Sequence, residues 1–153
     1  MQARPGTYAL VLRSPSKATV RVGRLGRIAL DPGYYVYVGS AFGPGGVRAR
    51  VSRHFLEEKR RHWHLDYLRD CTRPVGAWYS HDSRRLEHTW AQSLSALPGL
   101  AAVANFGCSD CACQSHLFYT TTRPALNAMP DFDDGDLKWV AYRGGETLQP
   151  STR

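Results

Sequence analysis

The chain has 153 residues, of which 42% are hydrophobic, and its 17 aromatic residues comprise 5 Phe, 4 Trp and 8 Tyr. This length and composition exclude a disordered tail and predict one packed domain whose core needs no disulfide or metal. The net charge of +7 at pH 7 favours polyanionic partners over acidic ones.

The positive charge is concentrated in the first half of the chain. Residues 1–70 carry 13 Lys and Arg against 5 Asp and Glu, a net charge of +8, whereas residues 71–153 carry 7 against 8, a net charge of −1. A polyanion is therefore expected to approach the N-terminal half, although general solubility also explains a basic composition. The polar first residues and the lack of a long apolar run predict a cytoplasmic protein with no signal peptide and no membrane contact.

Hydrophobic periodicity and turn residues predict an α+β domain with a small antiparallel sheet flanked by helices. The expected strands cover residues 6–13, 34–40, 75–79, 116–121 and 138–142, with an inserted hairpin formed by 18–21 and 26–30. The expected helices cover residues 47–60, 62–69 and 83–97. The tail after about residue 143 is expected to be flexible.

The first predicted helix combines a buried stripe with two polar residues. Val47, Val51 and Phe55 recur at intervals of four and form the stripe. Arg50 and His54 are also four residues apart, so they share a face that borders the stripe. Both side chains are therefore expected to lean toward the sheet.

Two tyrosine-bearing strands precede this helix, and together the three segments supply groups that phosphodiester cleavage uses. They are Gly6-Thr7-Tyr8, Tyr37-Val38-Gly39 and the helix with Arg50 and His54. An arginine can bind the non-bridging oxygens of a phosphate, a phenol or imidazole can move a proton, and a carboxylate can hold a divalent cation. Taken singly, a strand tyrosine or an Arg/His pair on a helix is usually an ordinary structural feature.

The order of these segments resembles the GIY-YIG endonuclease superfamily. It is most similar to a small prokaryotic branch, the Uri-type endonucleases. That branch has a GTY strand, a YYVYVGSA-x-GPGG stretch, an R-x-x-x-H helix, an HWH-[IL]-DYL segment and a late SDC-x-C-x-SHLFY stretch. These occur here at residues 6–8, 34–46, 50–54, 62–68 and 109–119. The resemblance covers most of residues 6–120.

The resemblance implies catalytic roles for four residues of these segments. Tyr8 is expected to act as the general base or to orient the attacking water, and Tyr37 to position the phosphate or the water. Arg50 is expected to stabilise charge on the phosphorane, and His54 to assist proton transfer. Gly39 is expected to allow close backbone packing beneath the two phenols.

The resemblance also implies one metal-binding glutamate on a later helix. Glu87 is the best candidate because it lies beside the apolar stripe of the third predicted helix, although an exposed helix glutamate is the alternative. The expected cofactor is Mg²⁺ or Mn²⁺. The family's late asparagine has two candidate counterparts, Asn105 and Asn127.

The expected reaction is hydrolysis of DNA, with RNA not excluded and no obligate protein partner. The nucleic-acid contacts predicted for it are Gly39, Ser40, Arg48, Arg53 and Lys59. A non-catalytic nucleic-acid-binding module and a zinc-stabilised adaptor are the alternatives.

Two further groups of residues could bind a metal. Cys108, Cys111, Cys113 and His116 are soft ligands that suit Zn²⁺, although reduced, packed thiols are the other interpretation. His62, His64 and Asp66 are interpreted as structural polar residues in preference to a metal site.

Overall fold

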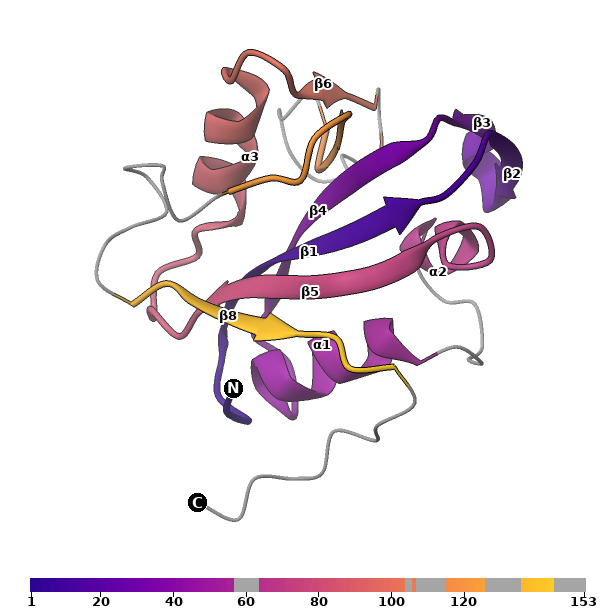
Figure 1. Cartoon of the computed structure of the whole chain (residues 1–153). Helices are drawn as coiled ribbons and strands as arrows, with labels where there is room; N and C mark the ends of the chain where they lie inside the picture. The colour runs from indigo at the N-terminus through magenta and orange to yellow at the C-terminus, as the bar shows by residue number, and fades with distance from the viewer. Residues whose placement is uncertain (57–63, 104–105, 107–114, 126–135, 145–153) are drawn as a thin grey trace.

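The computed structural model describes residues 1–56, 64–103, 106, 115–125 and 136–144, and its core is a six-stranded antiparallel sheet (Figure 1). The strand order is β6-β7-β4-β1-β5-β8. These strands are β1 (Gly6–Ser14), β4 (Gly33–Ala41), β5 (Arg73–Ser80), β6 (Ala101–Ala102), β7 (Leu117–Thr120) and β8 (Lys138–Ala141). The predicted α+β fold is confirmed.

The central strand β1 is buried all round. The strands β4 and β5 cover its two edges, and apolar clusters cover its two faces. Tyr8 pairs with Gly39 of β4 on one side and with Tyr79 of β5 on the other. Tyr8 and Leu10 enter one apolar cluster, whereas Ala9 enters another on the opposite face. This alternation is the period-2 pattern expected of a strand.

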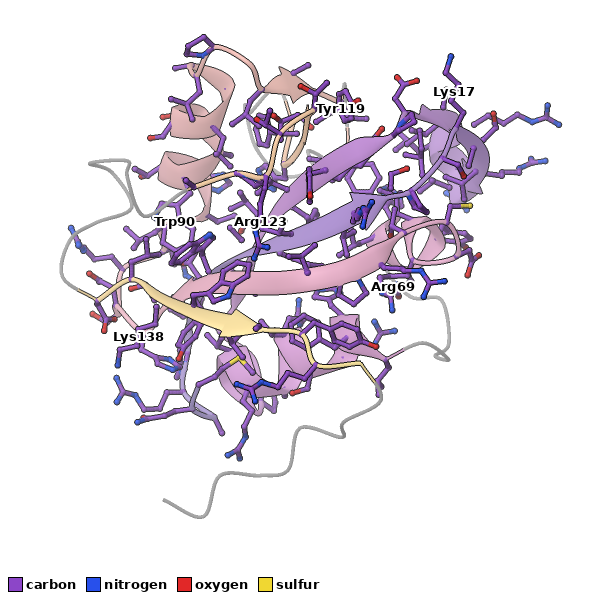
Figure 2. All side chains as sticks on the ribbon, in the orientation of Figure 1. Lys17, Arg69, Trp90, Tyr119, Arg123 and Lys138 are labelled. Atoms are coloured by element: carbon purple, nitrogen blue, oxygen red, sulfur yellow. The ribbon has the colours of Figure 1, made fainter. Side chains whose placement is uncertain are left out.

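Helices cover both faces of the sheet. Helices α1 (Gly46–Phe55) and α2 (His64–Leu68) pack on the Tyr8 face, and α3 (Glu87–Ser95) packs on the Ala9 face (Figure 1). The predicted stripe of α1 is fully or nearly buried, with Val47 and Val51 at 0% exposure. Trp90 of α3 is equally enclosed (Figure 2), so each helix is fixed by its own apolar core.

The inserted hairpin is present and forms a separate two-stranded sheet. Strands β2 (Ala18–Val22) and β3 (Gly26–Leu30) are joined by the 3₁₀ turn η1 (Gly23–Leu25). Val22 and Leu30 are buried in the same cluster as Tyr8. The hairpin therefore extends the core on the face that carries α1 and α2.

Two predicted helices are shorter in the structure than expected. Helix α1 ends at Phe55 instead of Arg60, because Leu56 is extended and Arg69 donates hydrogen bonds to the carbonyls of His54 and Leu56. These are orphan carbonyls of the last turn, which a basic side chain can satisfy.

Helix α3 begins at Glu87 instead of Ser83. The Leu86 N–H donates to the Thr7 hydroxyl at 3.3 Å, and the Arg84 N–H donates to Asp82 Oδ1 at 2.9 Å. Side chains thus replace a helical turn before Glu87.

The remaining boundaries differ by a few residues. The two-residue strand β6 was not predicted, and α2 is resolved from His64, since residues 57–63 lie outside the described part. The tail predicted to be flexible lies outside it from residue 145 onward. None of the helices in the described segments has the length and apolar character needed to span a membrane.

Candidate active site

The rings of three residues that the sequence singled out, Tyr8, Tyr37 and His54, lie close together on the face of the sheet that carries α1. The ring centroids of Tyr8 and His54 are 5.5 Å apart, those of Tyr37 and His54 are 6.1 Å apart, and those of Tyr8 and Tyr37 are 6.4 Å apart. The Tyr8 hydroxyl and His54 Nε2 are joined by a 2.8 Å hydrogen bond. We call these three residues and Arg50 the tyrosine site.

Arg50 completes the tyrosine site through a side-chain hydrogen bond with Tyr8. Helical spacing brings Arg50 and His54 to the same phenol, as the four-residue interval predicts. His54 is buried at 1% exposure, whereas Arg50 and Tyr37 are only half-buried. The site is therefore a buried phenol–imidazole pair with a guanidinium and a second phenol on its solvent side.

Burial has a strong effect on the central phenol. It raises the pKa of Tyr8 well above the ordinary value of 10.0, and the neighbouring Tyr37 adds to this shift, although Arg50 opposes it. Tyr8 is therefore a neutral phenol at neutral pH. A neutral phenol can donate to or orient a water, and the imidazole beside it is a common proton acceptor in catalysis.

Gly39 is required by the position of Tyr8. The Tyr8 ring lies directly over Gly39, so a Cβ built there would be 2.5 Å from Tyr8 Cζ and would also overlap the hydroxyl. Gly6 is required for a similar reason, because a Cβ there would overlap the Ser80 carbonyl oxygen. The two motif glycines are thus sites of close approach, as expected for Gly39.

Glu87 approaches the same end of the sheet from α3. Its Oε2 accepts a 2.6 Å hydrogen bond from the Ser40 hydroxyl, and its Oε1 lies 3.0 Å from His116 Nδ1. Burial acts to raise the pKa of Glu87, but hydrogen bonds from His116 and Ser40 outweigh it and lower the pKa below 4.5. The group is therefore an ionised carboxylate at neutral pH.

The carboxylate and the central phenol lie beside neighbouring residues of one strand. Ser40, which holds Glu87, follows Gly39, over which Tyr8 lies. The negative charge of Glu87 contributes to the raised pKa of Tyr8. Among the described residues, the last pair of the β4–β7 ladder is Tyr37 with Leu117. Gly39 and Ser40, beside which the phenol and the carboxylate lie, therefore follow the end of this ladder.

The predicted nucleic-acid contacts have different surroundings. Gly39 is buried beneath Tyr8, and Ser40 is half-buried and bound to Glu87. Arg48 is half-buried near the amino terminus of α1. Arg53 makes a paired ionic contact with the buried Asp66, at 2.8 and 3.0 Å, and so serves the core. Lys59 lies outside the described residues.

Sequence reasoning missed one basic and aromatic pair beside the site. The guanidinium carbon of Arg85 lies 4.4 Å from the ring centroid of Phe42, which belongs to the glycine-rich loop before α1. Arg85 precedes Glu87 by two residues and is exposed. Such a pair can contact a phosphate or a nucleobase.

The proposed zinc ligands fall mostly outside the described residues. Cys108, Cys111 and Cys113 lie there, whereas His116 is buried at 3% exposure and faces Glu87. In the part of the chain that is described, no three His, Cys, Asp or Glu residues form a group able to hold a metal ion. The asparagine candidates, Asn105 and Asn127, also lie outside it.

The other three metal candidates are His62, His64 and Asp66, and the two that are described are structural polar residues, as predicted. Asp66 is buried at 2% exposure and bound by Arg53, and the exposed His64 ring packs edge-on to Phe106. His62 lies outside the described residues.

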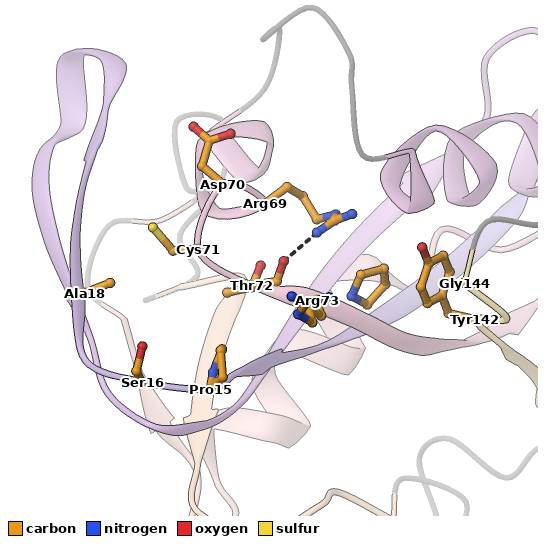
Figure 3. A pocket seen from close by; sticks show the side chains of 11 residues that line it. Pro15, Ser16, Ala18, Arg69, Asp70, Cys71, Thr72, Arg73, Tyr142 and Gly144 are labelled. Atoms are coloured by element: carbon orange, nitrogen blue, oxygen red, sulfur yellow. Dashed lines mark hydrogen bonds between the residues drawn. The ribbon is translucent and has the colours of Figure 1, made fainter.

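A cavity of about 710 Å³ lies at the other end of β1 from Tyr8 (Figure 3). It is lined by residues that follow β1, such as Ser16, and by residues before and at the start of β5, such as Cys71 and Arg73. Its Arg69 donates to the carbonyls of His54, Leu56 and Thr72 and therefore holds the backbone together. No residue of the tyrosine site lines this cavity.

The fold and the site define an α+β domain with a conjunction of phenols, imidazole, guanidinium and carboxylate at one end of its sheet. The chain belongs to the family described as domain of unknown function DUF123, whose model matches residues 7–132. No curated protein and no solved structure matches the chain. The match spans every residue of the tyrosine site together with Glu87.

Proposed function

We propose that this protein is an endonuclease of the GIY-YIG type that hydrolyses phosphodiester bonds in DNA with a divalent cation. The observation that carries the proposal is the convergence of Tyr8, His54 and Arg50 through direct hydrogen bonds. A neutral phenol, a proton acceptor and a phosphate-binding fork are the groups that this reaction needs.

Proton transfer in this proposal is shared between the phenol and the imidazole. The raised pKa of Tyr8 makes its phenolate rare at neutral pH, so the phenol alone is a poor base. His54 Nε2 lies 2.8 Å from the same hydroxyl and can take a proton through it. Tyr8 therefore orients the attacking water, and His54 receives the proton.

Arg50 is assigned to the phosphate. Its guanidinium hydrogen-bonds Tyr8 and is half-buried, so it is fixed beside the phenol and still accessible from solvent. A planar guanidinium can donate two parallel hydrogen bonds to phosphate oxygens. It would stabilise the negative charge that builds on the phosphorus centre.

Glu87 is assigned to the metal. It is the carboxylate held at the same end of β4, and its lowered pKa keeps it ionised at neutral pH. Mg²⁺ and Mn²⁺ prefer oxygen ligands, and Mg²⁺ is commonly bound by one or two carboxylates together with substrate phosphates. When bound, the cation would offset charge on a phosphate oxygen. The donor chemistry of the site fits this use.

The positive charge around the site supports a nucleic-acid substrate. Burial lowers the pKa of the Met1 amino group, and the positive charges of Lys138 and Arg48 lower it further. These three cationic groups therefore lie near one another, just before β1. Arg85, which lies over the Phe42 ring, precedes Glu87 by two residues. Basic residues thus border the site on the sides of both α1 and α3, as phosphate-backbone binding requires.

A nicking assay with supercoiled plasmid DNA tests this function. The wild-type protein should nick the plasmid with Mg²⁺ or Mn²⁺ and not with EDTA, and Glu87→Gln and Arg50→Ala should each lose most of this activity. Arg13→Ala and Asp70→Asn, at exposed positions at the other end of the sheet, are the matched controls and should cleave as wild type does.

A binding measurement separates catalysis from simple nucleic-acid binding. Salt-dependent binding of DNA without cleavage under any divalent cation would instead identify a nucleic-acid-binding module. Cleavage that persists undiminished in Glu87→Gln would show that the metal assignment is wrong.

A further inference from the structure

Both oxygens of the Glu87 carboxylate are held by side chains from different parts of the sheet. Oε2 accepts from the Ser40 hydroxyl of β4, and Oε1 faces His116 Nδ1 just before β7. The three residues are distant in sequence and meet only because α3 packs over β4 and β7. We call Ser40, Glu87 and His116 the carboxylate clamp.

His116 is itself fixed by the backbone on both sides. Its carbonyl accepts a 2.9 Å hydrogen bond from the Val38 N–H, and its own N–H donates to the Phe106 carbonyl at 2.9 Å. Its ring is 3% exposed, whereas the Glu87 side chain is 22% exposed. A rigid, buried imidazole therefore contacts a carboxylate that still reaches solvent.

An unrestrained glutamate in the first turn of a helix would adopt several rotamers. Ordering a glutamate side chain costs conformational entropy, and a metal ligand must be ordered when the cation binds. The clamp orders Glu87 in advance. It also leaves coordination capacity, because a carboxylate has about four lone-pair sites and the clamp uses two.

We propose that His116 and Ser40 are positioning residues that fix the Glu87 carboxylate beside the tyrosine site for binding of a divalent cation. This inference rests on the proposed function, since it takes Glu87 to be the metal ligand. Neither residue needs to touch the substrate. His116, which the cysteine spacing suggested as a zinc ligand, acts in this proposal through Glu87.

The test is direct titration of the full-length protein with Mn²⁺, followed by electron paramagnetic resonance of the free ion and without DNA. His116→Leu, which removes the donor, should weaken Mn²⁺ binding by about 10- to 100-fold, as outer-shell partners of metal ligands usually do. His116→Asn, whose amide can donate from a position close to Nδ1, should restore most of the affinity. Ser40→Ala should weaken binding in the same direction.

Ser115→Ala is the matched control. Ser115 is the neighbour of His116, is buried at 1% exposure and, among the described residues, hydrogen-bonds the backbone groups of Val103 and Leu117. Its loss should lower thermal stability and leave Mn²⁺ affinity unchanged. The contrast separates positioning of Glu87 from a general effect of disturbing this loop.

The outcomes distinguish the positioning proposal from the proposed function. Unchanged Mn²⁺ affinity in a folded His116→Leu variant, or no Mn²⁺ binding by the wild type, would overturn the positioning role. Weakened Mn²⁺ binding in His116→Leu, restored in His116→Asn, would support it even if no cleavage of DNA were found. In that case the endonuclease proposal alone would fail.

Discussion

The position of Gly39 beneath the Tyr8 ring makes the substitution Gly39→Ala a sharp test of the site. The new Cβ would lie 2.5 Å from Tyr8 Cζ and 3.1 Å from Cε1, whereas ordinary contacts begin at 3.4 Å. The ring or the strand must therefore move by roughly 1 Å, and overpacking of this kind costs about 1–3 kcal/mol. The 2.8 Å bond between Tyr8 and His54 would then be stretched or lost.

Two measurements check this expectation. The plasmid-nicking rate should fall by about 100-fold, because a displacement of 1 Å can cost that much in catalysis. The melting temperature should fall by about 2–4 °C per kcal/mol lost. Gly43→Ala is the control, since a Cβ there would meet nothing within 4 Å. If Gly39→Ala were as stable and active as Gly43→Ala, the placement of Tyr8 over the strand would be wrong.

Three other changes have expected outcomes. Arg53→Met should cost about 3 kcal/mol in urea unfolding, because it removes the paired ionic contact of Arg53 with the buried Asp66 carboxylate; a cost below about 1 kcal/mol would contradict this. Burial raises the pKa of Tyr8 above the unfolded value of about 10, so its contribution to stability is complete below pH 10 and is lost as the pH rises further. Denaturation at a series of alkaline pH values should therefore show a shallower loss of stability in Tyr8→Phe, and an unchanged slope would refute the shift. Arg50→Lys keeps the positive charge and removes the planar guanidinium. The nicking rate should therefore fall at least about 10-fold, while the salt dependence of DNA binding stays the same. Equal nicking rates in the wild type and this variant would show that Arg50 takes no part in the reaction.

The strands and the shared face of Arg50 and His54 could be predicted because their signals are local, whereas the grouping of that face with Tyr8 and Tyr37 was expected from the family resemblance. The alternation in β1 and β4 gives the strands, and the interval of four between Arg50 and His54 places both on the helix face that meets Tyr8. Burial of Val47 follows from the same periodicity. Spacing within one element determines which residues share a face, but the contact between Tyr8 of β1 and His54 of α1 is tertiary.

The partners of Glu87 could not be predicted, because they depend on how distant segments pack. His116 was grouped with three cysteines by its spacing, yet its ring faces Glu87, 29 positions earlier in the chain. Likewise, α1 ends where Arg69 donates hydrogen bonds to the carbonyls of its last turn, and no helix-ending residue near Phe55 in the sequence predicts that end. Local patterns determine which residues share a face, whereas tertiary contacts decide which partner satisfies a polar group.

Two separate apolar cores set the relative position of the proposed catalytic groups. On one face, the packing of α1 through Val51 places Arg50 and His54 against Tyr8. On the other face, the packing of α3 through Trp90 places Glu87 against Ser40. The sheet between them is the shared reference, since Tyr8 lies over Gly39 and Glu87 is bound by the next residue of β4, Ser40. Because side chains in close-packed cores have little freedom to shift, the position of the carboxylate relative to the phenol is set by the packing of the two helices on the sheet, in which Tyr8 itself takes part.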